Sequence, residues 1–275
     1  MNILVKQKLK EITPPFLWNL ARATNDSIRR IPELPAAYLH PWRRESIRRL
    51  VALKDIHRGK RAFVIANGPS LKQTDLSRLK NEITFGMNRI YLMFPELGFS
   101  TTYLTVVNDL VIEQTASDLA DISLPKFLAW RSRRHFPSNL PVPQVPTFLY
   151  TSYTGRLFST DVRGRVWEGA TVTNVTLQLA FHMGFQQVIL IGVDHSYTAT
   201  GKPNTTVVSQ GDDPNHFSPS YFGKGFRWQL PDLETSEVGY AMALDAYRKA
   251  GREILDATIS GKLTIFPKVD YDSLF

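Results

Sequence analysis

From about residue 60 onward, short apolar runs alternate with amphipathic segments, and each run ends in polar or small residues. The runs lie at residues 61–66, 83–87, 102–107, 126–130, 187–192 and 253–256, with a further extended segment at 147–150. Uninterrupted apolar runs are typical of strands in a parallel sheet that is covered on both faces. Strands that alternate with helices favour right-handed crossovers between parallel strands. The pattern predicts an α/β fold with a predominantly parallel sheet flanked by helices, and with the runs 61–66 and 187–192 buried near its centre.

The clearest predicted helix covers residues 169–183. It has a threonine-rich start, Val172, Val175 and Leu179 fall on one side, and Gly184 follows as a stop signal. Further helices are expected at residues 75–79, 110–119 and 236–250, and a proline-rich, irregular stretch at 131–146.

The N-terminal residues 1–59 are predicted to form a basic helical extension of a domain at 60–275. Thr13 suits an N-cap with Pro14 at the first helical position. Apolar residues then recur near helical spacing at Phe16, Leu17, Leu20, Ile28 and Ile31. A second helix is expected at 45–53. The first helix fits two roles: peripheral contact with an anionic membrane through residues 1–31, or packing on its own domain or on a second copy in a homo-oligomer.

Composition narrows the class of protein. A chain of 275 residues with 43% hydrophobic residues is long enough for one large α/β domain, and no window of about 20 apolar residues suggests a membrane span. The chain has no cysteine, which excludes disulfides, thiolate metal sites and cysteine nucleophiles. Its first residues lack the apolar core and cleavage site of a signal peptide, so we expect a cytoplasmic protein.

The net charge of +8 is concentrated at the N-terminal end. Residues 1–61 hold 14 Lys/Arg and 5 Asp/Glu, a balance of +9, and the remainder holds 19 basic and 20 acidic residues, a balance of −1. A nucleic-acid groove across the main domain is therefore not indicated. The basic N-terminal region instead favours the inner face of a membrane as a place of peripheral contact.

The turn Asn67-Gly68-Pro69-Ser70 follows the first predicted strand and is the first candidate for a ligand site. Gly68 can take a positive φ and lets a ligand approach the backbone, while Ser70 offers a hydroxyl and an N-cap. Free amides at such a turn bind phosphate. An ordinary strand–helix connection has the same composition. The prediction of a ligand site here therefore depends on a second strand and turn of matching chemistry at 188–197.

Ligands of parallel sheets bind outside the carboxyl ends of the strands, and polar side chains follow four of the predicted strands. These are Asn67, Gly68 and Ser70; Asn88; Asn108 and Asp109; and Asp194, His195 and Tyr197. Amides and hydroxyls suit the sugar, base edge and phosphate of a nucleotide without adding charge. Neither a Walker motif nor GxGxxG occurs, which argues against an ordinary ATPase or a dinucleotide-binding enzyme.

The segment 201–228, called here the 201–228 loop, has no apolar periodicity but contains several aromatic residues. A polar loop of this length is usually disordered or a functional lid, and aromatic residues argue against disorder. His216 is a candidate general base or acid, with a histidine packed within the loop as the alternative. Asp212 and Asp213 could hold Mg²⁺, although turn residues before Pro214 are the simpler interpretation.

Several motifs resemble a known family. NGPSL after the first strand, GMNRIYL at the second, VVND at the third, and AFHMGFQQVILIGVDHSY followed by NHF resemble the 6-hydroxymethylpterin diphosphokinase MptE-like family. They are also similar to the bacterial CMP-sialic-acid sialyltransferases, which are related in fold. The resemblance covers about residues 60–258 and implies a Rossmann-like domain that binds a nucleotide.

The resemblance implies roles for individual residues. Nucleotide contacts are implied for Asn67, Gly68, Pro69, Ser70, Asn88, Asn108, Asp109, Gly169, Thr171 and Gly192. A catalytic histidine in the loop is implied, and His216 is the histidine available, although the sialyltransferase S-H-Y-type triplet is replaced by Ser218, Pro219 and Ser220. Asp194 is the second catalytic candidate. Tyr221, Lys224 and Arg227 are candidates for closing over the site and stabilising a departing phosphate.

These observations favour a nucleotide-dependent transferase, above all a glycosyltransferase that uses a CMP-type sugar in surface-polysaccharide biosynthesis, with a carbohydrate or other small-molecule acceptor. The first alternative is an Mg²⁺-dependent diphosphokinase, for which Asp109 and Asp194 could hold the metal, although the sequence lacks a dense carboxylate cluster. The second alternative is a nucleotide-binding accessory protein without catalytic activity. Apart from Mg²⁺ in the diphosphokinase alternative, no cofactor is expected.

Overall fold

The computed structural model describes residues 17, 20, 24–25, 27–28, 30–198 and 201–275. By its internal contacts the chain divides into two compact units, residues 1–40 and 41–275. The first unit contains a 3-10 helix, η1 (Ile31–Glu33), and a short α-helix, α3 (Leu34–Leu39). The helix start predicted at Thr13 and Pro14 lies outside the described residues.

The second unit holds the sheet and the candidate site. Its α-helices are α4 (Pro41–Leu53), α5 (Phe94–Leu97), α6 (Asp109–Gln114), α7 (Ala116–Asp121), α8 (Val172–His182) and α9 (Leu233–Lys249). Its 3-10 helices are η2 (Pro69–Gln73), η3 (Leu76–Leu79), η4 (Ile90–Met93), η5 (Trp130–His135), η6 (Val142–Gln144) and η7 (Asp272–Leu274). Its strands are β1 (Arg61–Ile65), β2 (Thr84–Met87), β3 (Tyr103–Val106), β4 (Lys126–Ala129), β5 (Thr147–Ser152), β6 (Arg165–Trp167), β7 (Gln187–Ile191), β8 (Thr206–Val208), β9 (Arg227–Gln229) and β10 (Glu253–Asp256).

Eight strands form one sheet in the order β10-β7-β1-β2-β3-β4-β5-β6, and each neighbouring pair is parallel. The predicted α/β fold is thus confirmed. Strands β1 and β7 are neighbours, with Phe63 opposite Ile189 and Ile65 opposite Ile191, but they lie third and second from one edge of the sheet and not near its centre as predicted. The side chains of these four residues are fully buried, as their uninterrupted apolar pattern predicted.

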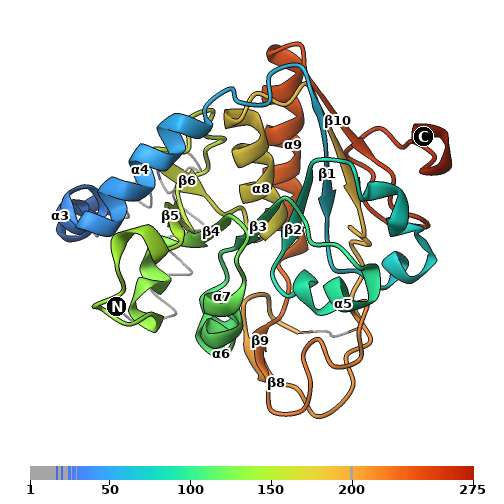
Figure 1. The fold of residues 1–275 in the computed structure, drawn as a ribbon, viewed down its shortest axis with the longest axis horizontal. Helices are drawn as coiled ribbons and strands as arrows, with labels where there is room; N and C mark the ends of the chain where they lie inside the picture. The colour runs from blue at the N-terminus through green and yellow to red at the C-terminus, as the bar shows by residue number, and fades with distance from the viewer. Residues whose placement is uncertain (1–16, 18–19, 21–23, 26, 29, 199–200) are drawn as a thin grey trace. The chain divides into compact units, whose positions relative to one another are not determined.

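Helices cover the sheet, and α8 and α9 lie side by side along it (Figure 1). The hydroxyl of Tyr247 on α9 donates a 2.8 Å hydrogen bond to the carbonyl oxygen of Leu177 on α8. Helix α4 lies against β5, where the amide of Phe148 donates to the hydroxyl of Ser46 at 2.9 Å. The larger unit therefore begins at Pro41, whereas the sequence pattern had placed the start of the domain at residue 60.

Several predicted elements differ in detail. The segment predicted as a helix at 75–79 is the 3-10 helix η3, and the one at 110–119 divides at Thr115 into α6 and α7. Helix α8 begins at Val172 because Gly169 and Ala170 have φ values of 56° and 57°, outside the right-handed helical region. Strands β6, β8 and β9 were not predicted, since three residues are too few to show a period.

Candidate active site

The turns after β1 and β7 bind each other, because the two strands are neighbours and end at the same edge of the sheet. The amide of Gly68 donates to the carbonyl oxygen of Gly192 at 3.0 Å. The Ser70 hydroxyl donates to Oδ2 of Asp194 at 2.7 Å, and the Ser70 amide donates to Oδ1 at 3.2 Å. The Ser70 donors predicted to receive a phosphate are thus occupied by the protein's own carboxylate.

Glycine is required at position 68 for a reason that the sequence did not show. Its φ is −68°, which every L-residue can adopt, so the positive φ that glycine allows is not used here. A Cβ atom at this position would lie 1.7 Å from Oδ2 of Asp194 and 2.7 Å from the carbonyl oxygen of Gly192. It is the Asp194 side chain that approaches the backbone here.

Asp194 is an ionisable group in a poorly solvated position. Burial raises the pKa of the Asp194 carboxyl above its ordinary value, the two hydrogen bonds from Ser70 oppose this effect, and the nearby Asp256 carboxylate adds to it. Residues of this kind, which line a cavity and have a pKa shifted by burial, are candidates for a functional role.

A cavity of about 580 Å³ lies outside the carboxyl ends of the strands. Ten of the candidate residues named from the sequence line it: Asn67, Gly68, Asn88, Asn108, Thr171, Gly192, Asp194, His195, Tyr197 and His216. Seven others do not line it: Pro69, Ser70, Asp109, Gly169, Tyr221, Lys224 and Arg227. The described lining residues include no lysine or arginine, and its carboxylates come from Glu168, Asp194 and Asp232.

Two amide side chains in this lining have acceptors without a protein partner. The Oδ1 atoms of Asn67 and Asn88 are buried and accept no hydrogen bond from the described residues. A buried acceptor that lacks a partner is costly unless a ligand or water supplies a donor. Hydroxyl groups of a sugar or the amino group of a base would satisfy both amides.

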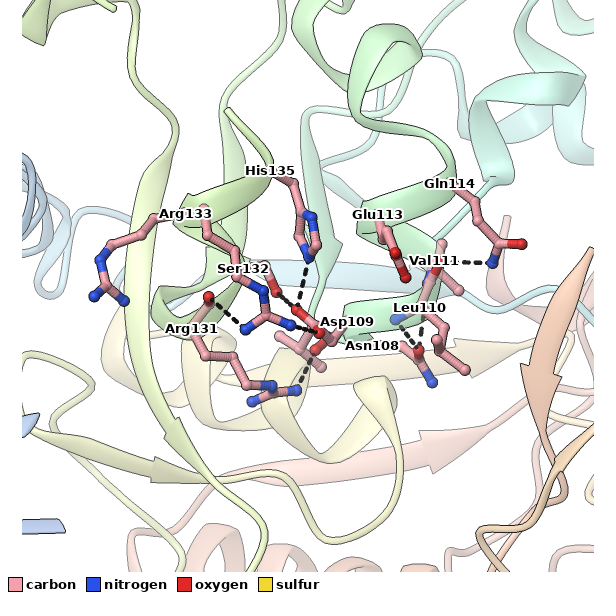
Figure 2. A network of polar contacts seen from close by, with 12 residues as sticks. Asn108, Asp109, Leu110, Val111, Glu113, Gln114, Arg131, Ser132, Arg133 and His135 are labelled. Atoms are coloured by element: carbon pink, nitrogen blue, oxygen red, sulfur yellow. Dashed lines mark hydrogen bonds and ion pairs between the residues drawn. The ribbon is translucent and has the colours of Figure 1, made fainter. Parts of the chain in front are cut away.

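Two further predicted nucleotide contacts, Asn108 and Thr171, accept hydrogen bonds from backbone amides of the protein itself. Asn108 is the N-cap of α6, with Oδ1 accepting from the amides of Leu110 at 3.0 Å and Val111 at 3.3 Å (Figure 2). Thr171 is the N-cap of α8, and its hydroxyl accepts from the amide of Thr173 at 3.2 Å. Both caps place a helix start at the cavity, and the capping side chains already occupy the first-turn amides of Leu110, Val111 and Thr173.

The 201–228 loop brings a histidine–aspartate pair to the cavity. Strands β8 and β9 form an antiparallel hairpin, and the segment between them carries His216. Nδ1 of His216 lies 2.7 Å from Oδ2 of Asp213, whose Oδ1 accepts from the amide of Asn215 at 2.9 Å. Asp213 is therefore both the predicted turn residue and a partner of the imidazole, a role that sequence reasoning missed.

Aromatic packing fixes the ring of His216. It stacks on Tyr221 with 3.9 Å between ring centroids and 11° between the planes, and Phe222 meets its edge at 4.9 Å. Tyr221 is fully buried beneath it, so it supports His216 and does not line the cavity. Arg89, which directly follows Asn88, donates through its guanidinium to the carbonyl oxygen of Tyr221 and so ties the loop to the end of β2.

Neither of the two predicted phosphate-binding cations, Lys224 and Arg227, lines the cavity. The Arg227 guanidinium pairs with Oε2 of Glu113 at 2.9 Å, and its backbone exchanges two 2.8 Å hydrogen bonds with the side-chain amide of Gln114. These contacts fasten β9 to α6. Lys224 is exposed. The predicted role of either residue at a departing phosphate is therefore not supported by its position.

Asp109 lies in a polar cluster beside the cavity and not in its lining. Its carboxylate accepts from the Ser132 hydroxyl at 2.7 Å, pairs with the guanidinium of Arg134, and lies 3.2 Å from Nε2 of His135 (Figure 2). With Asp109 neutralised in this way and both oxygens of Asp194 bonded to Ser70, the carboxylates do not fit a protein-bound Mg²⁺. Within the described part of the chain, no group of three His, Asp or Glu side chains is arranged to hold a metal.

A second histidine of the cavity lining, His195, also pairs with a carboxylate. Nε2 of His195 lies 2.9 Å from Oε1 of Glu237 on α9, and its ring meets Tyr240 edge-on at 6.1 Å. His195 has a φ of 54°, in the left-handed region that few non-glycine residues adopt. The sequence offered one signal for it, its place directly after Asp194, but none for its partner, which lies 42 residues away.

Within the described residues, none of the helices combines the length and the apolar composition that a bilayer crossing requires.

Comparison with known proteins places the larger unit in a family. The family model described as 6-hydroxymethylpterin diphosphokinase MptE-like matches residues 41–200, which confirms the resemblance found in the motifs and supports a transferase-like role. No curated protein sequence matches the chain. Among solved structures, the MAf glycosyltransferase from Magnetospirillum magneticum AMB-1 is similar with a TM-score of 0.46 and 13% identity, over 84% of this chain and 39% of that protein. The chain thus spans well under half of that structure's length.

Proposed function

The chain belongs to the 6-hydroxymethylpterin diphosphokinase MptE-like family, and we propose that it is a glycosyltransferase that uses a nucleotide-activated sugar of the CMP type. The acceptor is a carbohydrate or another small molecule with a free hydroxyl, and the biological setting is surface-polysaccharide biosynthesis in the cytoplasm.

The main support for this proposal is the position of His216 in the lining of the cavity. Asp213 bonds to Nδ1, which leaves Nε2 without a hydrogen-bond partner among the described residues. A carboxylate on one nitrogen holds the proton there, so the other nitrogen is free to accept a proton from a substrate. This is the arrangement that a general base needs.

The reaction follows from this geometry. Nε2 of His216 takes the proton of the acceptor hydroxyl while the acceptor oxygen attacks the anomeric carbon of the donor sugar. The bond between that carbon and the phosphate oxygen breaks, and its electron pair leaves with the nucleoside monophosphate. Asn67 and Asn88 offer acceptors to the nucleoside, and the Phe222 and Trp228 side chains of the loop help to exclude water from the cavity.

A ligand screen tests the proposal. Thermal unfolding of the full chain is measured with CMP, CDP, UDP, GDP and ATP, each with and without Mg²⁺, because a ligand that binds only the native state raises the melting temperature. We expect CMP to stabilise the protein in the absence of Mg²⁺. No shift with any nucleotide would contradict the proposal.

Diphosphoryl transfer is the second candidate, and the description of the family favours it. This reaction needs a nucleoside triphosphate, which brings several more negative charges than a monophosphate. The described cavity lining offers no lysine or arginine to balance them and contains three carboxylates. Stabilisation by ATP with Mg²⁺, and not by CMP, would favour the diphosphokinase over the glycosyltransferase.

The basic N-terminal residues suit a peripheral contact with an anionic membrane. Leu17, Leu20, Ile28 and Ile31 are exposed apolar side chains, between 43% and 61% accessible. Exposed apolar side chains among basic residues favour the interface of an anionic bilayer. Such a contact through residues 1–31 would bring the transferase close to a lipid-linked or membrane-delivered acceptor.

A further inference from the structure

The charges around the cavity do not suit a phosphate unless a cation is supplied. Of its three carboxylates, Glu168 is paired with the guanidinium of Arg131, and Asp232 caps α9 by accepting from the amide of Thr235 at 3.0 Å. Asp194 is hydrogen-bonded to Ser70 but has no cationic partner among the described residues. Because Lys224 and Arg227 lie outside the cavity, the imidazoles of His195 and His216 are the side chains of the described lining that can become cationic.

The positions of His216 and His195 suit two different roles. His216 must be neutral at Nε2 to accept a proton from the acceptor, so it does not also supply the charge that a phosphate needs. His195 bonds through Nε2 to Glu237, and its Nδ1 has no hydrogen-bond partner among the described residues. The carboxylate of Glu237 supplies the counter-charge for a protonated ring, whose Nδ1–H is then a charged donor available to a ligand.

Backbone conformation supports this assignment. His195 follows Asp194 directly, at the carboxyl end of β7, and its left-handed φ of 54° is an uncommon conformation for a residue with a side chain. Such conformations persist when the surroundings require them and are concentrated at functional sites. Glu237 and Tyr240, both on α9, are ionisable groups in contact with this ring.

We propose that His195, paired with Glu237, is the cationic side chain that binds the phosphate of the donor and stabilises it as it departs. The inference rests on the proposed function, and it assigns to His195 the role that the sequence had suggested for Lys224 or Arg227. It also identifies the preferred donor as one with a single phosphate, since the described lining supplies one imidazolium beside the base.

Calorimetry with CMP and with cytidine tests the role of His195, because the two ligands differ only in the phosphate. The wild-type protein should bind CMP more tightly than cytidine. In His195→Gln this preference should fall by about tenfold or more, the loss expected for one charge-assisted hydrogen bond, while the affinity for cytidine stays the same. His195→Lys should keep much of the preference, and the matched control His216→Gln should keep all of it.

The outcomes separate the two claims. If His195→Gln keeps the wild-type preference for CMP, or loses CMP and cytidine equally, the phosphate role of His195 is wrong while nucleotide binding stands. If the wild-type protein shows no preference for CMP over cytidine, the proposed function fails and the role of His195 fails with it. Glu237→Gln should lower the preference less than His195→Gln, because it removes only the counter-charge.

Discussion

The backbone amide of Phe217 donates a 2.9 Å hydrogen bond to the carbonyl oxygen of Asn67. This single contact joins the 201–228 loop to the turn after β1, although the two residues are far apart in the sequence. Because Phe217 directly follows His216, the bond fixes the distance between the proposed base and the turn that carries Asn67. One side of the cavity is therefore formed by the 201–228 loop, which is hydrogen-bonded to the turn after β1.

The Asp213–His216 pair gives the first prediction. Asp213→Asn should keep the loop in place, because an amide can still accept from the Asn215 amide, but it no longer holds the proton on Nδ1 of His216. The single-turnover rate should fall by roughly 10²-fold while the affinity for nucleotide changes little. A rate within twofold of the wild type would show that Asp213 serves the turn alone. Asp212→Asn is the matched control.

The buried carboxylate of Asp194 should lower the stability of the folded protein at neutral pH. Burial raises the pKa of Asp194, so the folded protein holds this proton more tightly than the unfolded chain does. Its contribution to stability is then present at acid pH and is lost as the pH rises through the pKa of the folded state. Asp194→Asn should raise the melting temperature at pH 7.5 by about 1–4 °C.

The gain from Asp194→Asn should shrink in acid, where the wild-type carboxyl is also neutral. Asp245→Asn, which alters an exposed carboxylate paired with Lys249, is a control that should leave the melting temperature nearly unchanged. An equal gain for Asp194→Asn at every pH would contradict the electrostatic explanation.

We expect the protein to lose stability in mild acid because of two histidines that lie away from the cavity. Burial lowers the pKa values of His57 and His182 below 6.5, with Lys60 adding to the effect at His57. The unfolded chain therefore binds these protons first, and the stability that both neutral rings provide is lost as the pH falls below about 6.5. Urea unfolding at pH 7.5 and 5.5 measures this loss.

The contribution of His182 to this acid sensitivity can be measured separately. Its side chain is fully buried, and Nε2 bonds to the carbonyl oxygen of Leu50 at 2.8 Å. His182→Asn should lower stability at pH 7.5 through lost packing, but the further loss between pH 7.5 and 5.5 should be smaller than in the wild type. A loss as steep as in the wild type would exclude His182 as a source of acid sensitivity.

The N-terminal residues predict a salt-sensitive contact with lipid. Full-length protein should sediment with anionic vesicles at low salt, and deletion of residues 1–31 should release it without changing nucleotide binding. Moderate salt should mimic the deletion, because it screens the attraction of basic residues to the lipid surface. If the full-length protein stays in the supernatant with anionic vesicles, these residues serve packing or a homo-oligomer instead.

The sheet could be predicted from the sequence because its signal is local. The uninterrupted apolar runs of β1 and β7 required burial on both faces, and the parallel order of the strands followed from their alternation with helices. The polar strand ends could be predicted for the same reason: the carboxyl ends of parallel strands meet at one edge, so Asn67, Asn88 and Asp194 come together at the cavity.

What the sequence did not show depends on contacts between distant segments. Arg227 is an ordinary loop cation in the sequence, and only the docking of β9 on α6 shows that Glu113 binds it. Gly68 was explained by its backbone freedom, whereas the carboxylate of Asp194 is what excludes a side chain there. The partnership of His195 with Glu237 likewise requires the position of α9.

The central claim is that His216 is the base of a transfer reaction, and the single-turnover rate of His216→Ala tests it most directly. The measurement uses the donor from the nucleotide screen with one acceptor, and compares the wild type, His216→Ala and Asp194→Asn. We predict that His216→Ala lowers the rate by about 10²–10⁴-fold with nearly unchanged nucleotide affinity. A His216→Ala rate equal to that of the wild type would contradict the account.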